Sequence, residues 1–257
     1  MPTVLPDTEV RVACHENAAL TPGAGDSPSQ ARLVARFGGE RTVPLEDGSL
    51  AFPAMDAPDV VRVEWLDDDG NVLFASRVEV VNRHYFELSE LRDFGDGQDE
   101  FGDLPDDMLW QARQAATEVF EEAARRSFVL RYGRTRDYGI DDSRWFYLDH
   151  NDVESIETEG YRLVSDCQVE RTACDGEYPR DIEYLYGTDS VPAQVSRAVL
   201  ELAAYMLRPT NRPIGATGES SDAGYVHFTT AGRDGATDIP EVNAAVQQFG
   251  RDVRYVW

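Results

Sequence analysis

The sequence predicts an α+β protein with a β-rich N-terminal part and a mainly helical C-terminal part. Apolar and polar residues alternate through roughly the first 90 positions, and apolar residues recur at helical spacing in three later segments. An acidic, glycine-punctuated segment, residues 93–103, separates the two patterns. We therefore expect an immunoglobulin-like β-sandwich over 1–92, an acidic linker over 93–103, and a helical domain with β-hairpin insertions over 104–257.

Short strands separated by turns are expected from residue 8 to about residue 90. In Val61-Arg62-Val63-Glu64-Trp65 the apolar side chains share one face, and Asp69-Gly70 then offers a hairpin turn. Similar alternation occurs at 8–14, 31–37 and 72–80. Six or seven such segments, separated by loops rich in proline and glycine, are typical of a small immunoglobulin-like sandwich.

A long amphipathic helix is expected over residues 104–127. Pro105 suits the start of a helix, and Asp106 and Asp107 lie near its positive end. The apolar positions of the expected buried stripe are Leu109, Ala112, Ala116, Val119, Phe120, Ala123 and Ala124.

Two further helices are expected after a stretch of strands and turns at 128–188. The first opens at Val191-Pro192 and ends before Pro209. The second has an Asp238-x-x-Glu241 sequence that resembles a capping box, and a glycine at position 250 to end it.

The charge of the chain excludes several partners. There are 48 acidic side chains against 24 basic ones, the basic residues are all arginine, and the net charge is −24. Wrapping duplex DNA or docking on an anionic membrane requires a basic face, so neither is expected. The first ten residues do not resemble a signal peptide, and no apolar run approaches the ~20 residues that cross a bilayer. We expect synthesis in the cytoplasm and no membrane association.

No catalytic, cofactor or metal site is expected from the motifs. The cysteines, Cys14, Cys167 and Cys174, have no metal or redox spacing, although Cys167 and Cys174 could face each other across a hairpin. The four histidines are scattered singly, and the acids of 93–103 do not follow the spacing of a calcium-binding loop. Nucleophile and phosphate-binding signatures are missing from the sequence.

One order of segments resembles a known family. It begins with DDMLWQARQAATEVFEEAARRSF (106–128) and FYLDHNDVESIETEG (146–160), and continues with VPAQVSRAVLELAAYMLRP (191–209) and IPEVNAAVQQFGRDVRY (239–255). From Leu104 onward the chain thus resembles the head–tail connector, or adaptor, proteins of long-tailed bacteriophages. The segment at 217–242 resembles a long loop in versions from phages of actinobacteria.

The resemblance implies a structural virion protein and no enzyme. Such proteins form a homo-oligomeric ring, usually of twelve subunits, on the portal protein, and they present a platform to a downstream connector or tail protein. DNA passes through the ring without specific binding, no cofactor is needed, and the protein, made in the host cytoplasm, resides at the head–tail interface of the virion. Helix arginines are the expected contacts between subunits: Arg113, Arg125, Arg126, Arg197 and Arg208.

The last residues form an aromatic tail. Val253, Tyr255 and Trp257 alternate as in a strand with one apolar face. Such a segment either folds back on its own domain or adds to a neighbour, with the portal as the expected neighbour and with its aromatic residues as anchors.

Two other classes of function stay open from the sequence. The immunoglobulin-like domain could serve another virion or surface protein in adhesion, binding a glycan or a protein through its loops. Alternatively, the acidic clusters could serve a metal-dependent hydrolase.

Overall fold

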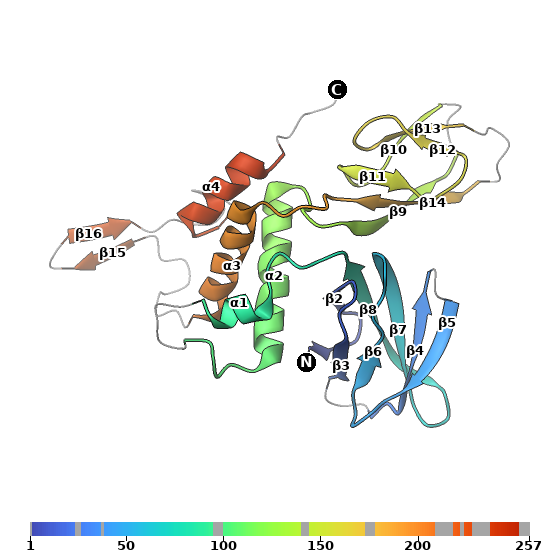
Figure 1. Ribbon diagram of the computed structural model, residues 1–257, viewed down its shortest axis with the longest axis horizontal. Helices are drawn as coiled ribbons and strands as arrows, with labels where there is room; N and C mark the ends of the chain where they lie inside the picture. Colours follow the sequence, from blue (N-terminus) through green and yellow to red (C-terminus); the bar gives the residue numbers. More distant parts are fainter. Residues whose placement is uncertain are drawn as a thin grey trace. The chain divides into compact units, whose positions relative to one another are not determined.

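The computed structural model (Figure 1) describes residues 2–23, 27–36, 39–94, 100–139, 144–172, 178–208, 218–221, 224–227 and 237–251. The chain folds into two compact units, each built from two separate stretches of sequence. Unit 1 comprises Met1–His84 and Ser127–Ser190, and unit 2 comprises Tyr85–Arg126 and Val191–Trp257.

The N-terminal stretch of unit 1 forms a β-sandwich of two sheets, which confirms the expected immunoglobulin-like architecture and the α+β class. The larger sheet has the order β2 (Glu9–Ala13), β8 (Val72–Val81), β7 (Asp59–Leu66), β4 (Gln30–Ala35) and β5 (Gly39–Pro44). The smaller sheet has the order β1 (Thr3–Val4), β3 (Ala18–Pro22) and β6 (Leu50–Phe52). Strand β2 runs parallel to β8, whereas β7 pairs antiparallel with both β8 and β4.

The core of the sandwich follows the alternation of β7. Val61, Val63 and Trp65 are at most 1% exposed. Trp65 stacks on Phe74 with ring centroids 5.6 Å apart, and its indole Nε1 donates a hydrogen bond of 2.9 Å to the Ser76 hydroxyl. The indole N–H therefore keeps a polar partner inside an apolar core, where an unmet donor would be costly.

The described residues of the second stretch of unit 1, within 127–190, form six strands in two three-stranded sheets. One has the order β11 (Val153–Ile156), β14 (Arg180–Tyr186) and β9 (Arg131–Asp137), and the other β10 (Trp145–Tyr147), β13 (Gln168–Arg171) and β12 (Tyr161–Leu163). They share a core of Leu148, Val153, Val169, Ile182, Tyr184 and Tyr186. A Cβ at Gly133 would lie 2.4 Å from the Tyr184 ring, so β9 needs a glycine where that ring crosses it.

Where the structure describes it, unit 2 is a helical assembly with a β-hairpin. Its elements are α1 (Leu88–Arg92), α2 (Asp106–Ala124), α3 (Ala193–Leu207), α4 (Pro240–Phe249) and the strands β15 (Gly218–Ser221) and β16 (Gly224–His227). Helix α2 packs against the other three helices, and α2 and α3 lie side by side in Figure 1. The buried side chains of the helices include Leu109, Ala116, Phe120, Val195, Val199, Leu202 and Val242.

The two long helices form where the sequence predicts them. Pro105 and Pro192 occupy the N-cap positions of α2 and α3, and α3 ends at Leu207. Helix α2 ends because Arg125 takes a left-handed conformation, with φ at 55°. The last carbonyl of α2, that of Ala124, accepts a 2.9 Å hydrogen bond from the backbone N–H of Arg251, which satisfies a group that the helix leaves open.

Two helix starts differ from the sequence-based expectation. The short helix α1 was not expected inside the β-rich part. At α4 the expected capping box at Asp238 is wrong, because the helix begins at Pro240 and Ile239 occupies the cap, with no side-chain cap bond. Instead, the Asn243 amide oxygen accepts a 2.9 Å bond from the Thr237 backbone N–H, and Asn243 Nδ2 donates a 2.9 Å bond to the Thr237 carbonyl.

The unit boundaries fall elsewhere than the linker expected at 93–103. Residues 127–190 belong with the N-terminal sandwich, because Asn82 exchanges two hydrogen bonds with Leu130, of 2.8 and 3.2 Å. Residues 85–126 belong with the later helices. The Tyr85 hydroxyl, for example, donates a buried 2.9 Å bond to the Glu121 carboxylate. The chain therefore crosses between the units three times.

Candidate functional site

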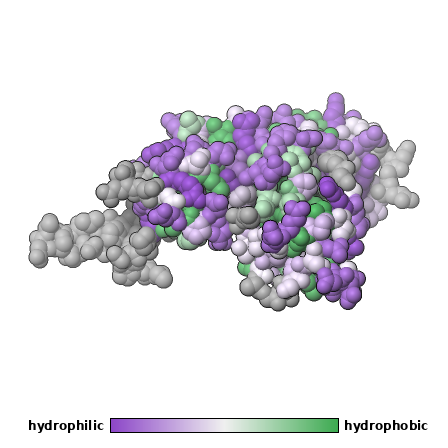
Figure 2. Space-filling view, turned by 60° about the horizontal axis from the view of Figure 1, so that its bottom comes forward, coloured by the Kyte–Doolittle hydropathy of each residue, from purple (hydrophilic) through white to green (hydrophobic). Residues whose placement is uncertain are grey.

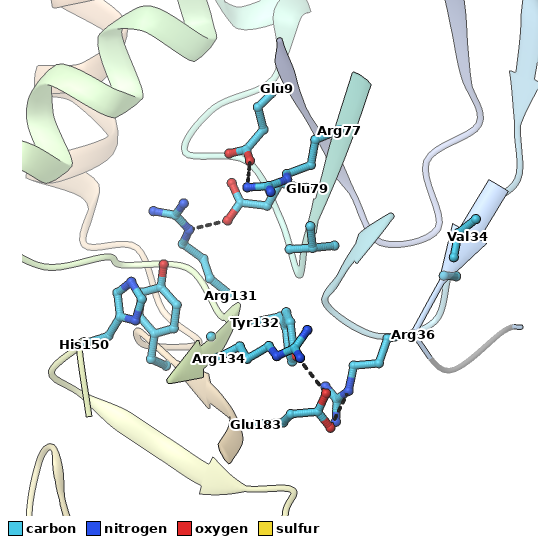
Figure 3. A pocket seen from close by; sticks show the side chains of 14 residues that line it. Glu9, Val34, Arg36, Arg77, Glu79, Arg131, Tyr132, Arg134, His150 and Glu183 are labelled. Atoms are coloured by element: carbon cyan, nitrogen blue, oxygen red, sulfur yellow. Dashed lines mark hydrogen bonds and ion pairs between the residues drawn. The ribbon is translucent and has the colours of Figure 1, made fainter. Parts of the chain in front are cut away.

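Unit 1 contains a cleft of about 590 Å³ with a strongly charged lining, where strands of the N-terminal sheet face β9 and β14 (Figure 3). Its charged and aromatic lining consists of Glu9, Arg36, Arg77, Glu79, Arg131, Tyr132, Arg134, His150, Glu183 and Tyr186. These residues come from both stretches of unit 1, so folding alone brings them together. We call this the arginine–carboxylate cleft.

Glu79 on β8 is the centre of the deepest ion-pair network of the cleft. Its carboxylate is bound by Arg11 Nε on β2 at 2.8 Å and by Arg131 Nε on β9 at 2.5 Å. Burial by itself would raise the pKa of Glu79, but the two guanidinium groups outweigh it and hold that pKa below its ordinary value. The network thus fastens β9 of the second stretch to two strands of the first.

Glu183 on β14 makes a second link. Its carboxylate is bound by Arg36 Nε at 2.9 Å and accepts a 3.0 Å hydrogen bond from the Tyr132 hydroxyl. The Arg36 guanidinium also lies 4.4 Å from the centre of the Tyr132 ring. Burial, followed by the bond to Glu183, raises the pKa of Tyr132 to about 12, so its hydroxyl stays protonated and keeps donating at neutral pH.

His150 forms the aromatic wall of the cleft. It stacks on Tyr186 with ring centroids 3.9 Å apart, and its Nδ1 lies 2.7 Å from the Tyr184 hydroxyl. Burial, and then the positive charge of Arg131, lower the pKa of His150. The imidazole is therefore neutral at neutral pH and acts as a packing and hydrogen-bonding group.

The mouth of the cleft is also paired. Arg77 lies 3.5 Å from the Glu9 carboxylate, and Arg134 pairs with Asp181. Burial, and then the neighbouring Glu79, raise the pKa of Glu9. All four arginines that line the cleft hold a carboxylate of the same unit, and two of these pairs, Arg131–Glu79 and Arg36–Glu183, link the two stretches of chain.

Of the arginines expected at subunit contacts, Arg113 is buried. It is 3% exposed on α2, and its guanidinium lies 4.6 Å from the centre of the Trp110 ring. This placement leaves Arg113 no surface for a neighbouring subunit, so that part of the expectation does not fit the structure. The spacing of the sequence is compatible with a solvated helix face for Arg113. In the structure Arg113 and Trp110 both lie on a buried face of α2.

The other four lie at or near the surface of unit 2. Arg125 is exposed at the end of α2, and Arg126 is half-buried, with a 3.5 Å bond from its Nη1 to the Phe249 carbonyl. Arg197 is exposed on α3, 4.5 Å from the centre of the Phe94 ring. Arg208 makes two 3.0 Å bonds to the Glu100 carboxylate. The structure does not gather the four into one site.

A groove of about 620 Å³ runs between α3 and α4. It is lined by alanines and by polar side chains: Ala193, Gln194, Arg197, Ala198, Glu201, Glu241, Ala244, Ala245 and Gln248. In this lining, Arg197 is the residue expected from the sequence at contacts between subunits.

Several expected features lie outside the described residues. These are the tail residues Val253, Tyr255 and Trp257, and Cys174, the expected partner of Cys167. Within the described ranges, no group of three or more His, Cys, Asp or Glu side chains is arranged to hold a metal ion.

No helix in the described part of the chain has the length and apolar character needed to cross a membrane.

No protein-family model and no curated protein matches the chain. Among solved structures it is similar to a chain of the "Virion of native gene transfer agent (GTA) particle", with 20% identity, a TM-score of 0.41, and coverage of 66% of this chain and 91% of that one. A chain of the "Neck of empty GTA particle computed with C6 symmetry" gives 19% identity, the same TM-score and the same coverage. Fibronectin(III)-like modules of Clostridium thermocellum CbhA give 16% identity and a TM-score of 0.22, over 31% of this chain and 93% of that one. Likeness at these TM-scores establishes neither a family nor a function.

Proposed function

We propose that this protein is a structural subunit of a tailed-phage type of particle, the adaptor that forms a ring between the portal and the tail. The observation that supports this most is unit 2. Helices α2, α3 and α4 pack together although residues 127–190 interrupt them, and they occur in the order that the resemblance to head–tail connectors implies. The ring of that family usually has twelve subunits.

The charge of the chain suits a ring through which DNA moves. With a net charge of −24, carboxylates that face a channel offer the phosphates no ion pairs. DNA can then slide without being held. Subunits of equal charge repel each other, so contacts between them need guanidinium–carboxylate pairs and apolar burial. The accessible helix arginines Arg125, Arg197 and Arg208 are candidates for such contacts.

In this proposal the N-terminal sandwich is an addition to the adaptor, carried on the outside of the ring. The sequence resemblance begins only at Leu104, so the ring would be built by the helices that follow this residue, α2, α3 and α4. The arginine–carboxylate cleft would then hold residues 127–190 to the sandwich within each subunit.

Electron microscopy of the particle that contains this protein is the direct test. The expected result is density for unit 2 in a ring between the portal and the tail, around the DNA channel. Density at the tail tip or on the outer surface would favour adhesion through the immunoglobulin-like domain instead and would contradict the adaptor proposal.

The tail at 252–257 offers a second test. If it docks on the portal, its deletion leaves the melting temperature of the isolated protein nearly unchanged and abolishes incorporation into heads. A truncated protein that melts several degrees lower and still docks would show that the tail belongs to its own fold.

Lack of DNA binding is a further expectation of the same proposal. The purified protein should not shift duplex DNA in a gel at low salt, where phosphate contacts are strongest. Micromolar binding under those conditions would contradict the idea that the channel lets DNA slide freely.

A further inference from the structure

The sheet β10-β13-β12 has an outward face with an unusual composition. Trp145 on β10, Glu170 on β13 and Arg162 on β12 lie directly opposite one another across the three strands. Tyr147 and Gln168 form the next row, and the Gln168 amide donates a 3.1 Å hydrogen bond to the Tyr147 hydroxyl. Because side chains alternate along a strand, these residues share one face.

The opposite face of the same sheet already forms the core. Val169 is fully buried, and Phe146 and Leu163 pack against the same cluster. The aromatic residues that flank Phe146 therefore point outward, and Trp145 and Tyr147 remain 43% and 58% exposed. In Figure 2 hydrophilic residues cover much of the visible face of the molecule. Trp145 and Tyr147 are two of several large hydrophobic side chains that stay exposed, and they lie together on one sheet face beside two arginines.

Two arginines lie beside these aromatic rings. The guanidinium groups of Arg144 and Arg162 both pair with Glu170, and Arg162 Nε lies 3.0 Å from that carboxylate. Glu170 is 3% exposed beneath them, whereas both arginine side chains are 67% exposed. Two guanidinium groups against one carboxylate give this cluster an excess positive charge, on a chain that is strongly acidic. The buried carboxylate thus holds two arginine side chains that remain largely exposed to water.

We propose that this face, formed by Arg144, Trp145, Tyr147, Arg162 and Gln168, docks a second copy of this chain. Tryptophan, tyrosine and arginine are the residues that contribute most to protein–protein interfaces. The charge fits the occupant, because each copy carries twice as many carboxylates as guanidinium groups. A guanidinium group has five N–H donors, so an arginine that already pairs with Glu170 can also bind a carboxylate of the partner.

A single-stranded nucleic acid is the alternative occupant, since aromatic rings and arginines also stack with bases. The charges favour protein. Glu170 lies between the two guanidinium groups, and the whole chain carries −24, which opposes a polyphosphate. The choice of a second copy rests on the proposed function, in which copies lie side by side in a ring.

Sedimentation velocity of the full-length protein across a wide concentration range, at physiological salt, tests the inference. We expect the wild type to self-associate, and the double variant Trp145→Ala/Tyr147→Ala to weaken the association about tenfold or more while keeping its circular dichroism spectrum and melting temperature. The matched control is Val72→Ala/Leu73→Ala, which removes two exposed apolar side chains, 46% and 39% exposed, from β8 and should leave the association unchanged.

Charge variants at one position sharpen the result. Tyr147→Glu should weaken self-association more than Tyr147→Arg does, because the partner surface is acidic. A wild type that stays monomeric at every concentration overturns the inference, as does equal association of the wild type and the aromatic double variant. Binding of oligo(dT), followed by tryptophan fluorescence and lost in Trp145→Ala, also overturns it. A particle ring in which this face touches no neighbouring copy would overturn the inference and leave the adaptor function standing.

Discussion

Ion pairs in unit 1 and unit 2 use the same residue types in different surroundings. In unit 1, Glu79 is 4% exposed and joins Arg11 to Arg131 across 120 positions of sequence. In unit 2, Glu100 and Arg208 are 36% and 38% exposed at their side chains. Removing a partner from a buried pair strands a charge, whereas exposed pairs are screened by water and salt. The buried network therefore restricts which segments can pack together, whereas the exposed pair contributes little to the stability of unit 2.

The second stretch of unit 1 contains another buried pair. Arg171 makes two bonds to the Asp137 carboxylate, of 2.7 and 2.8 Å, and the Tyr161 hydroxyl donates a third, of 2.9 Å. Burial opposes ionisation of Asp137, but these bonds hold its pKa below the ordinary value. This pair links β9 to β13, strands of the two three-stranded sheets that both belong to the second stretch. The Glu79 network, in contrast, joins the second stretch to the first.

The largest expected effect comes from removing one side of the Glu79 network altogether. A fragment of residues 103–257 keeps β9 but loses Glu79, Arg36 and the backbone partner Asn82. We expect its β-sheet part to lose cooperative thermal unfolding, measured by circular dichroism, because a buried surface and its ion pairs are left without partners. A fragment that melts cooperatively, with the full helix and sheet signal, would show that the chain divides at 93–103 after all.

Glu79→Gln should be next in size. This substitution keeps the shape of the side chain but removes its negative charge, so Arg11 and Arg131 face a neutral amide at a buried position. We expect the free energy of unfolding to fall by on the order of 3 kcal/mol. Urea unfolding at neutral pH measures the loss. An exposed ion pair contributes at most about 1 kcal/mol to stability. A variant whose free energy of unfolding lies within about 1 kcal/mol of the wild-type value would therefore mean that water reaches this network.

The pH dependence of stability separates the buried from the exposed pair more finely. The folded-state pKa of Glu79 lies below its ordinary value of 4.5, so its stabilising contribution is complete above pH 4.5 and declines as pH falls through the lowered pKa. Asp137 adds the same trend from 3.8, while Glu9, whose pKa is raised, works in the opposite direction above 4.5. We expect Glu79→Gln to lose stability less steeply than the wild type below pH 4.5. Parallel urea-unfolding profiles for the two proteins would contradict the assignment.

The smallest expected effect is that of Glu100→Ala. It removes the carboxylate from Arg208 at an exposed position, so the melting temperature should match that of the wild type within experimental error. Differential scanning calorimetry of both proteins is the measurement. A clear drop in melting temperature would remove the contrast between exposed and buried pairs on which the comparison rests.

Local sequence patterns were sufficient for the long helices and most strands. Helix α2 and helix α3 follow apolar spacing and proline starts, and β7 follows strict alternation, all properties of neighbouring residues. The helix α1 went unpredicted although a local signal exists, since Glu90 accepts a 2.7 Å bond from the Glu87 backbone N–H as a capping box does. A helix of five residues among strands is too short for periodicity to reveal.

The functional candidates depended far more on contacts between distant residues. Nothing near Arg131 or Glu79 in the sequence shows that they meet, and the helix α2 sequence alone does not show that Arg113 becomes buried when the helices pack together. The outward placement of Trp145 and Tyr147 had one local sign, an aromatic run of three residues that cannot all face one side of a strand.

The sequence by itself determined the α+β class, the positions of the two long helices and the acidic character, because backbone propensity, apolar period and charge are local or additive properties. The tertiary structure alone decided that residues 127–190 join the N-terminal sandwich, which arginines are buried, and which face of β10 meets water. Those outcomes depend on which surfaces are buried against each other, and burial sets the cost of an unpaired charge.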